Sequence, residues 1–183
     1  MTQRIQSQKI SAIIAGQLES MIIEGSLEPG QKMHALEEVA AHYAALRATP
    51  EDHAIIERRY QEWLDGHQAR LGAKAEAELD WRFHLSIAEA SHNAVLLHSM
   101  RALLSLFKQT IATNLTYLYT EEGRRDTIRL QHEALKNAVI QRNEDDARQA
   151  VNNHLAFVEE TLQQSSRFES HAQRALRRFS MIR

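Results

Sequence analysis

Apolar residues recur along this chain at intervals of three and four positions, and strict alternation of apolar and polar residues is rare. Residues with this spacing lie on one face of an α-helix, so the pattern predicts amphipathic helices rather than half-buried strands. Only two prolines and six glycines interrupt the 183 residues. The sequence therefore predicts an all-α protein.

Capping and turn residues divide this pattern into separate helices. Gly25 follows the first apolar stripe at the position where a left-handed residue often ends a helix, and Pro29–Gly30 predict a turn-and-extended piece after it. Thr49 is placed to cap a helix whose first residue is Pro50. The expected helices span about 9–24, 34–46, 50–64, 75–90, 94–119, 123–141 and 144–164, with a loop at 66–74.

Charge and composition narrow the class of protein. The formal net charge is −2 at pH 7, so no global basic field indicates binding to nucleic acid or to an anionic membrane. No cysteine occurs, which excludes disulfides, thiolate metal sites and cysteine nucleophiles. The N-terminus lacks the apolar core of a signal peptide, and no apolar run approaches the roughly 20 residues that span a bilayer. We therefore expect a soluble cytoplasmic protein with no membrane partner.

Four ionisable residues fall on helix faces that the pattern assigns to the core. Asp80 and His84 are four residues apart and share a face with apolar residues. His132 and His154 each lie in register with the apolar positions of the two last predicted helices. An ionised carboxylate is costly to bury unless it is paired or bound to a metal, so this placement points to a site.

One aspartate and three histidines suit a divalent metal ion. Zinc is the first choice, with nickel and manganese as alternatives, because these ions accept imidazole and carboxylate ligands. A hydrogen-bonded polar cluster in the core is the alternative interpretation of the same residues. The other histidines fall at helix ends, in loops or on mixed faces, and we expect most of them to be solvated: His34, His42, His53, His67, His92, His98 and His171.

Three segments around these residues resemble one known family. They are DWRFHLSIAEASHN at 80–93, QHEAL at 131–135 and ARQAVNNHL at 147–155. All three are similar to the C-terminal effector domain, called FCD, of FadR-type members of the GntR transcription regulators. Within this family, the three segments are most similar in sequence to the glycolate- and lactate-responsive regulators. The resemblance implies an antiparallel helical bundle.

The same resemblance implies a site and partners. Members of the family commonly hold a divalent metal with residues that correspond here to Asp80, His84, His132 and His154. A small carboxylate effector binds beside the metal and shifts the DNA-binding heads. Such regulators usually work as homodimers on palindromic operator DNA.

The N-terminal segment resembles another part of this family. IIEGSLEPGQKM at 22–33 is similar to the opening of a GntR winged helix-turn-helix domain. The recognition helix and wing that read DNA in the family do not follow it, so we do not expect this chain as written to bind an operator specifically. A true deletion and residues missing from the sequence as written both stay open. Met33 stands where the family often has an arginine aimed at the effector.

The expected organisation has three parts. They are a partial winged-helix segment at 1–33, an FCD-like effector domain at 34–165 and a basic tail at 166–183. The tail is interpreted either as a solvated helix face or as a weak, salt-dependent phosphate contact. Arg101 is a candidate contact for the effector carboxylate, with a surface charge as the alternative.

The leading hypothesis is a transcription regulator, not an enzyme. Its helical domain would bind a divalent metal and sense a small carboxylate such as a hydroxy acid, and operator DNA would be the partner of the intact regulator. One alternative is a truncated dimerisation module that modulates an intact regulator. The other is a metal-dependent hydrolase, although the chain has no HExxH, no nucleophile motif and no phosphate-binding glycine loop.

Overall fold

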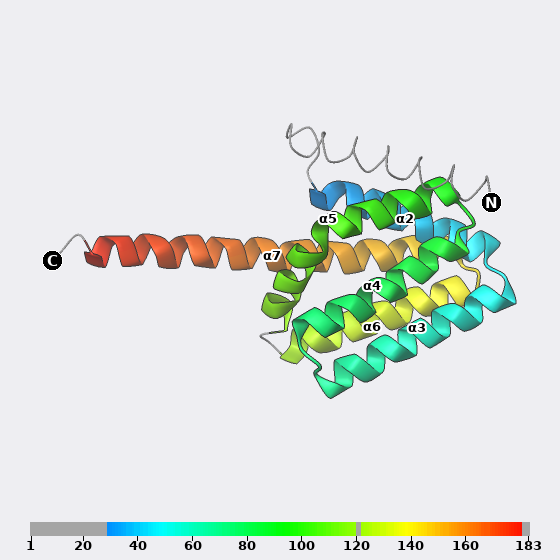
Figure 1. Ribbon diagram of the computed structural model, residues 1–183, viewed down its shortest axis with the longest axis horizontal. Helices are drawn as coiled ribbons and strands as arrows, with labels where there is room; N and C mark the ends of the chain where they lie inside the picture. The colour runs from blue at the N-terminus through cyan, green and yellow to red at the C-terminus, as the bar shows by residue number, and fades with distance from the viewer. Residues whose placement is uncertain (1–28, 120–121, 181–183) are drawn as a thin grey trace.

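The computed structural model describes residues 29–119 and 122–180, which form six α-helices and no strand within these ranges. The helices are α2 Pro29–Arg47, α3 Pro50–Ala69, α4 Ala73–Ala90, α5 Ala94–Leu118, α6 Glu122–Ile140 and α7 Glu144–Ser180 (Figure 1). The predicted all-α fold is therefore confirmed.

Short connections join these helices into an antiparallel bundle (Figure 1). Helix α2 packs against α7 and α4, α3 packs against α4 and α6, and α6 packs against α7. The C-terminal part of α7 projects beyond the bundle (Figure 1). This arrangement places α4, α6 and α7, the helices that carry the predicted ligands, next to one another or against shared neighbours.

The core pairs small residues on one helix with large residues on the others. Small side chains allow neighbouring helices to approach closely, and the bulky ones fill the remaining space. The small set is a row of buried alanines on α2 and directly after its end: Ala40, Ala41, Ala44, Ala45 and Ala48. The largest fully buried apolar side chains include Ile56, Trp63, Phe83, Met100, Ile128 and Leu135.

The connection between α3 and α4 is shorter than the sequence predicted. We expected a loop at 66–74, but α3 continues to Ala69 and α4 begins at Ala73. Gly66 lies buried inside α3, where an added Cβ would collide with the side chain of Leu79 on α4. This glycine therefore permits a close helix approach and does not end the helix. The helix ends instead at Arg70, which adopts the left-handed conformation with φ 53°.

The start of α2 also differs from the expectation. Helix α2 begins at Pro29, whereas the sequence predicted an extended piece until about residue 34. Proline is well suited to the first helical turn, because the N–H that it lacks has no partner there in any helix. The predicted helix at 9–24, and the part of the winged-helix resemblance before Pro29, lie outside the described residues.

Two predicted helix starts are confirmed in detail, and one helix is longer than expected. Thr49 and Asp52 form a reciprocal capping box, in which Thr49 N–H donates to Asp52 Oδ2 at 2.8 Å. Asn93 caps α5 by accepting from two backbone N–H groups. Helix α7 runs to Ser180 rather than ending near residue 164, so the backbone shows no break at the expected boundary of the basic tail.

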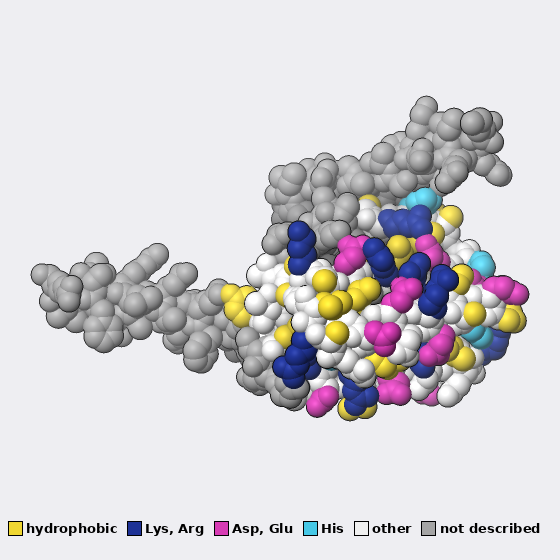
Figure 2. All heavy atoms as spheres, turned by 60° about the horizontal axis from the view of Figure 1, so that its bottom comes forward, with side chains coloured by type: hydrophobic (Ala, Val, Ile, Leu, Met, Phe, Trp, Pro, Cys, Tyr) yellow, Lys and Arg dark blue, Asp and Glu magenta, His cyan; other side chains and the backbone are white. Residues whose placement is uncertain are grey.

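Lys and Arg side chains are interspersed with Asp and Glu on the face of the bundle shown in Figure 2. This mixture agrees with the formal net charge of −2. No helix among the described residues is long and apolar enough to cross a membrane.

Candidate metal centre

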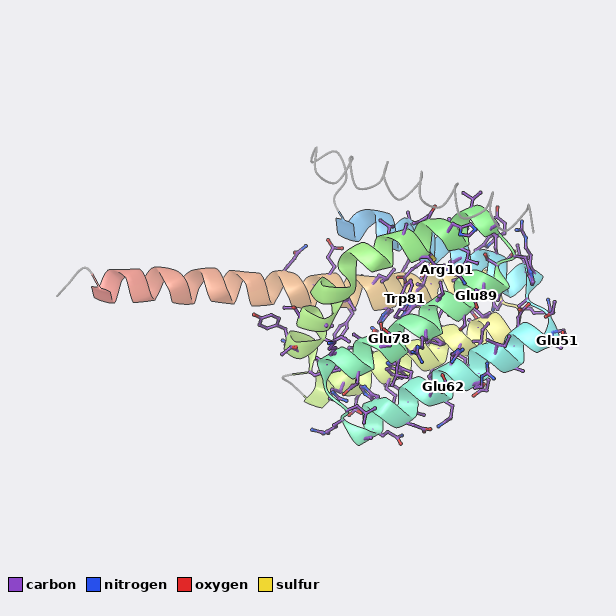
Figure 3. The ribbon with its side chains drawn as sticks, in the orientation of Figure 1. Glu51, Glu62, Glu78, Trp81, Glu89 and Arg101 are labelled. Carbon is purple, nitrogen blue, oxygen red and sulfur yellow. The ribbon has the colours of Figure 1, made fainter. Side chains whose placement is uncertain are left out.

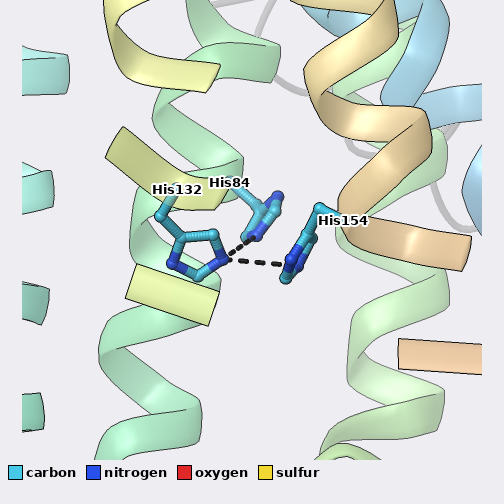
Figure 4. A group of neighbouring side chains, drawn as sticks. All are labelled: His84, His132 and His154. Atoms are coloured by element: carbon cyan, nitrogen blue, oxygen red, sulfur yellow. Dashed lines mark hydrogen bonds between the residues drawn. The ribbon is translucent and has the colours of Figure 1, made fainter. Parts of the chain in front are cut away.

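Three histidines from three helices converge in the bundle (Figure 4). His84 of α4, His132 of α6 and His154 of α7 are all buried. His132 Nε2 lies 3.2 Å from His84 Nε2 and 3.3 Å from His154 Nε2. One ring nitrogen of each histidine lies within 4.8 Å of the others. The structure therefore brings together three residues that are separated by up to 70 positions in the sequence.

Helical register explains why these rings point inward. Each histidine has at least one buried apolar side chain three or four positions away on its own helix, so each ring shares the core face of its helix. Ile87 and Ala88 accompany His84, Ile128 and Leu135 accompany His132, and Val151 accompanies His154. The predicted inward placement of the histidines is confirmed.

Asp80 adjoins this group without joining its tightest part. Its Oδ1 lies 3.5 Å from His132 Nε2, and its side chain is 17% exposed. Burial raises the pKa of Asp80 to about 6, with the negative charges of Glu37 and Glu76 adding to the effect and His84 opposing it. Asp80 therefore lies beside the three nitrogens as a carboxyl group whose negative charge is not fully neutralised by its neighbours.

Two residues that the sequence analysis did not single out contact the far sides of the rings. Glu37 Oε2 of α2 lies 3.0 Å from His84 Nδ1, an ion-pair distance, although the angle is not that of a good hydrogen bond. Gln131 Oε1 lies 3.1 Å from His154 Nδ1. The amide nitrogen of Gln131 faces the backbone oxygen of Asn153, so its oxygen is the acceptor for His154. These contacts favour a proton on Nδ1 of both rings.

This tautomer assignment leaves an excess of lone pairs at the centre. With Nδ1 protonated, the Nε2 atoms of neutral His84 and His154 are bare acceptors that both face His132 Nε2. An N–H on His132 Nε2 can be donated well to only one of them. A cation placed between the three nitrogens would accept all three lone pairs, so the donor set fits a metal ion.

In the ion-free protein, a proton takes part of this role. Burial alone would lower the pKa of His84, but the carboxylates of Glu37 and Asp80 outweigh it and raise the pKa to about 9. Burial and the neighbouring histidines hold the pKa of His132 and of His154 well below the usual value. His84 is therefore the imidazolium of the three at neutral pH, and it can donate from Nε2 to His132.

Aromatic rings surround His132. Trp63 packs on it with a centroid distance of 4.3 Å, and Phe83 lies at 5.2 Å. Buried His132 Nδ1 and Trp63 Nε1 have no hydrogen-bond partner among the described residues. Buried polar atoms are normally satisfied, so these two mark the centre as a place where protein contacts alone are incomplete.

A second buried polar cluster also contacts Trp63, through the ring of His67. Its residues are His67 of α3, Glu76 of α4 and Arg125 of α6. One guanidinium nitrogen of Arg125 donates to Glu76 Oε2 at 2.9 Å and to the His67 carbonyl oxygen at 2.6 Å. The guanidinium also lies over the Tyr119 ring at 3.9 Å. This cluster connects the ends of α3, α4 and α6, and within it the positive charge of Arg125 offsets the negative charge of Glu76.

His67 corrects the expectation that the other histidines are mostly solvated. It is buried and stacks on Trp63 at a centroid distance of 4.8 Å. Burial and the charge of Arg125 lower its pKa, and Glu76 opposes them. The four-residue spacing from Trp63 was the available signal, but it depends on recognising that α3 continues past Gly66.

Arg101 lies at the surface, away from any described contact with the three histidines. Its guanidinium pairs with Glu89 Oε1 at 2.6 Å, and both side chains are more than 40% exposed (Figure 3). This placement favours the surface-charge interpretation over a contact with an effector carboxylate. The side chains of the basic tail lie outside the described residues.

Comparison with known proteins identifies the family. Residues 31–157 match the FCD domain, so the chain belongs to the FCD domain family. The resemblance to effector domains of GntR transcription regulators is thereby confirmed.

Individual relatives are regulators of transcription. A protein of Escherichia coli (strain K12) named as an L-lactate dehydrogenase operon regulatory protein is 34% identical over 129 residues, covering 70% of this chain and 48% of that protein. The Glc operon transcriptional activator of the same strain is 32% identical over 129 residues, covering 69% and 51%. The HTH-type transcriptional regulator LutR of Bacillus subtilis (strain 168) is 36% identical over 104 residues, covering 56% and 45%.

This chain spans about half the length of the curated relatives it matches. The relatives are regulators, and the family is not enzymatic, so the hydrolase alternative has no support among them.

Proposed function

We propose that this chain is the effector-sensing part of a GntR-type transcription regulator, and that its centre holds a divalent metal. The ligands are Asp80, His84, His132 and His154. The observation that carries the proposal is the convergence of two Nε2 atoms on a third: those of His84 and His154 lie 3.2 and 3.3 Å from His132 Nε2. Two ligands of a tetrahedral zinc ion at Zn–N of about 2.0–2.1 Å stand about 3.3 Å apart, which matches both distances.

Zinc fits this donor set best, with nickel and manganese as alternatives. Three imidazoles favour zinc or nickel, whereas the carboxylate of Asp80 makes manganese acceptable. The metal would supply a positive charge and, by accepting a fifth ligand, a coordination position to a small anion. The protein's own residues hold the imidazoles in place, exclude bulk water and surround the site with the rings of Trp63 and Phe83.

The proposed effector is a small carboxylate such as a hydroxy acid. A carboxylate oxygen is a suitable additional ligand for a hard or borderline divalent ion, and a neighbouring hydroxyl could bind the same ion. One of the relatives is named for the L-lactate dehydrogenase operon, which supports a 2-hydroxy acid as the first compound to test. The buried, unpartnered Trp63 Nε1 offers a hydrogen-bond donor close to His132.

Regulation would follow from differential binding. An effector shifts the equilibrium between two arrangements of the regulator only by the difference between its affinities for them. The metal centre joins α4, α6 and α7, so its occupation would change how these helices pack. Operator DNA and a second copy of the regulator are the proposed partners of the intact protein.

Metal content tests this proposal directly. Protein purified without chelator or added metal is analysed for elements, beside a His132→Ala variant and a His92→Ala control. His92 lies at the surface and pairs with Asp52, so its removal should leave the centre intact. We expect about one divalent ion per wild-type and control chain, and loss of the ion in His132→Ala.

The outcome against the proposal is a folded wild-type protein that contains no metal and binds none when zinc, nickel or manganese is added. The four residues would then be a polar cluster of the core. When metal is present, titration with L-lactate and glycolate, with acetate as the control, tests the effector class by calorimetry.

A further inference from the structure

We infer that Glu37 is a positioning residue of the metal centre, and that through it helix α2 responds to occupation of the centre. This inference rests on the proposed function, since it gives a role to a residue that supports a metal ligand. Glu37 lies on a different helix from all four proposed ligands.

The surroundings of Glu37 make its burial costly. On the described part of α2, every other buried residue is an alanine. A carboxylate placed among such residues loses its hydration, and this loss is tolerated only where a partner compensates for it. The partner here is His84 Nδ1 at 3.0 Å, and both side chains are less than 10% exposed.

The geometry assigns Glu37 to orientation rather than ligation. It contacts Nδ1 of His84, whereas the nitrogen that faces His132 is Nε2, on the opposite side of the ring. A carboxylate this close to Nδ1 favours, by its charge, the tautomer whose Nε2 lone pair is free, and it increases the electron density on Nε2. Glu37 therefore prepares His84 to bind a cation without touching the cation itself.

Helix α2 has further contacts with a ligand-bearing helix. It packs against α7, which carries His154, and Glu38 pairs with Arg148 of α7 at 3.2 Å. Because Glu37 ties α2 to α4 through His84, one helix is held against two of the three helices that provide imidazoles. Helix α2 also begins at Pro29, within the segment at 22–33 that resembles the start of a DNA-binding domain. Occupation of the centre is thus linked to the helix in which that segment ends.

Three variants separate positioning from general structure. Glu37→Leu removes the acceptor, Glu37→Gln keeps an acceptor oxygen without the charge, and Glu38→Gln alters the adjacent residue of α2 that faces Arg148. Zinc affinity is measured by competition with a chelator, and the visible spectrum of the cobalt-loaded protein reports the ligand geometry. We expect Glu37→Leu to weaken zinc binding by about 10–100-fold and to change the cobalt spectrum. Glu37→Gln should recover most of the affinity, and Glu38→Gln should bind like the wild type.

Amide hydrogen exchange tests the link to α2. In the wild type, zinc should slow exchange in α2 as well as in α4, α6 and α7. In Glu37→Leu loaded with saturating zinc, the slowing should persist in α4, α6 and α7 and be lost from α2. A purely structural role for Glu37 would change exchange equally with and without the metal.

Two results would overturn the inference, and they are distinguishable from each other. If Glu37→Leu binds zinc within threefold of the wild type while His132→Ala does not bind, the metal proposal stands and the role of Glu37 is wrong. If the wild type itself binds no metal, the proposed function fails and the inference fails with it.

Discussion

The two buried polar clusters of this bundle differ in how their charges are satisfied. In the cluster of His67, Glu76 and Arg125, a guanidinium and a carboxylate neutralise each other at 2.9 Å. In the histidine centre, three nitrogens converge, and the charged side chains beside them are the carboxylates of Asp80 and Glu37. The charges of the first cluster are neutralised by protein side chains alone. The second is complete only with a proton or a metal ion, and this difference separates a structural network from the proposed metal site.

The largest expected effect on stability comes from disrupting the cluster of His67, Glu76 and Arg125. Arg125→Met leaves Glu76 buried without its charge partner, which should lower the free energy of unfolding by about 3–5 kcal/mol. Zinc affinity of the folded variant should stay within threefold of the wild type. Urea unfolding in the presence of chelator gives the first quantity, and chelator competition gives the second.

A double variant serves as the control for this experiment. Arg125→Met combined with Glu76→Met removes both charges and should recover a large part of the lost stability, because no uncompensated charge remains. If Arg125→Met alone costs less than about 1 kcal/mol, the cluster is not the structural network that we describe.

The next effect is stabilisation by the metal. A ligand that binds only the folded state adds about 4 kcal/mol when its concentration is a thousand times the dissociation constant. Zinc should therefore raise the melting temperature of the wild type and of Arg125→Met, but not that of His132→Ala. Differential scanning fluorimetry with and without zinc measures the shifts. An equal shift in His132→Ala would place the bound metal elsewhere on the protein.

The pH dependence should distinguish the two clusters further. The pKa of His84 in the ion-free protein is raised to about 9, so a metal must displace a proton from this ring at neutral pH. Apparent zinc affinity should rise about tenfold for each pH unit between 7 and 9 and then level off. Competition titrations across this range test the slope. A flat profile from pH 7 to 9 would show that His84 is not protonated before the metal binds.

The same group affects the stability of the ion-free protein in the opposite direction. Its pKa is raised above the ordinary value of 6.5, so its contribution to stability is fully present below pH 6.5 and is lost as the pH rises through about 9. Urea unfolding of the chelated protein at pH 7 and pH 9 should show this loss, and His84→Ala should not.

The smallest effect is expected at Arg101. Its pair with Glu89 is well exposed, so Arg101→Ala should change the free energy of unfolding by no more than about 1 kcal/mol. Metal binding and any effector binding should be unchanged. A loss of carboxylate affinity in a calorimetric titration of this variant would instead restore Arg101 as an effector contact.

The sequence predicted those features that depend on residues close together in the chain. Helical periodicity placed His84, His132 and His154 on inner faces, and the cap at Thr49 identified the start of α3. Each of these inferences needs only positions within one helix. The inward faces suggested that the three rings share one site, and the family resemblance strengthened this hypothesis, since periodicity within single helices does not say which helices are neighbours.

The features that the sequence analysis missed depend on contacts between helices. Gly66 was interpreted as a helix end because its role, to admit Leu79 of α4, involves a partner outside its own helix. Glu37 was passed over because an isolated glutamate on an alanine-rich helix resembles an ordinary surface charge until His84 is placed beside it. Arg125 likewise appeared as one of many arginines. Buried ion pairs between distant segments leave no periodic signal in the sequence.

The length of α7 has a mechanical consequence. The helix has 37 residues, and the stretch from His154 to Ser180 is about 39 Å long at 1.5 Å per residue, lying first within the bundle and then beyond it. A tilt of about 5° at His154 would move the far end by about 3 Å over that length. A small adjustment at the histidine centre would then be amplified along α7 into a larger displacement outside the bundle.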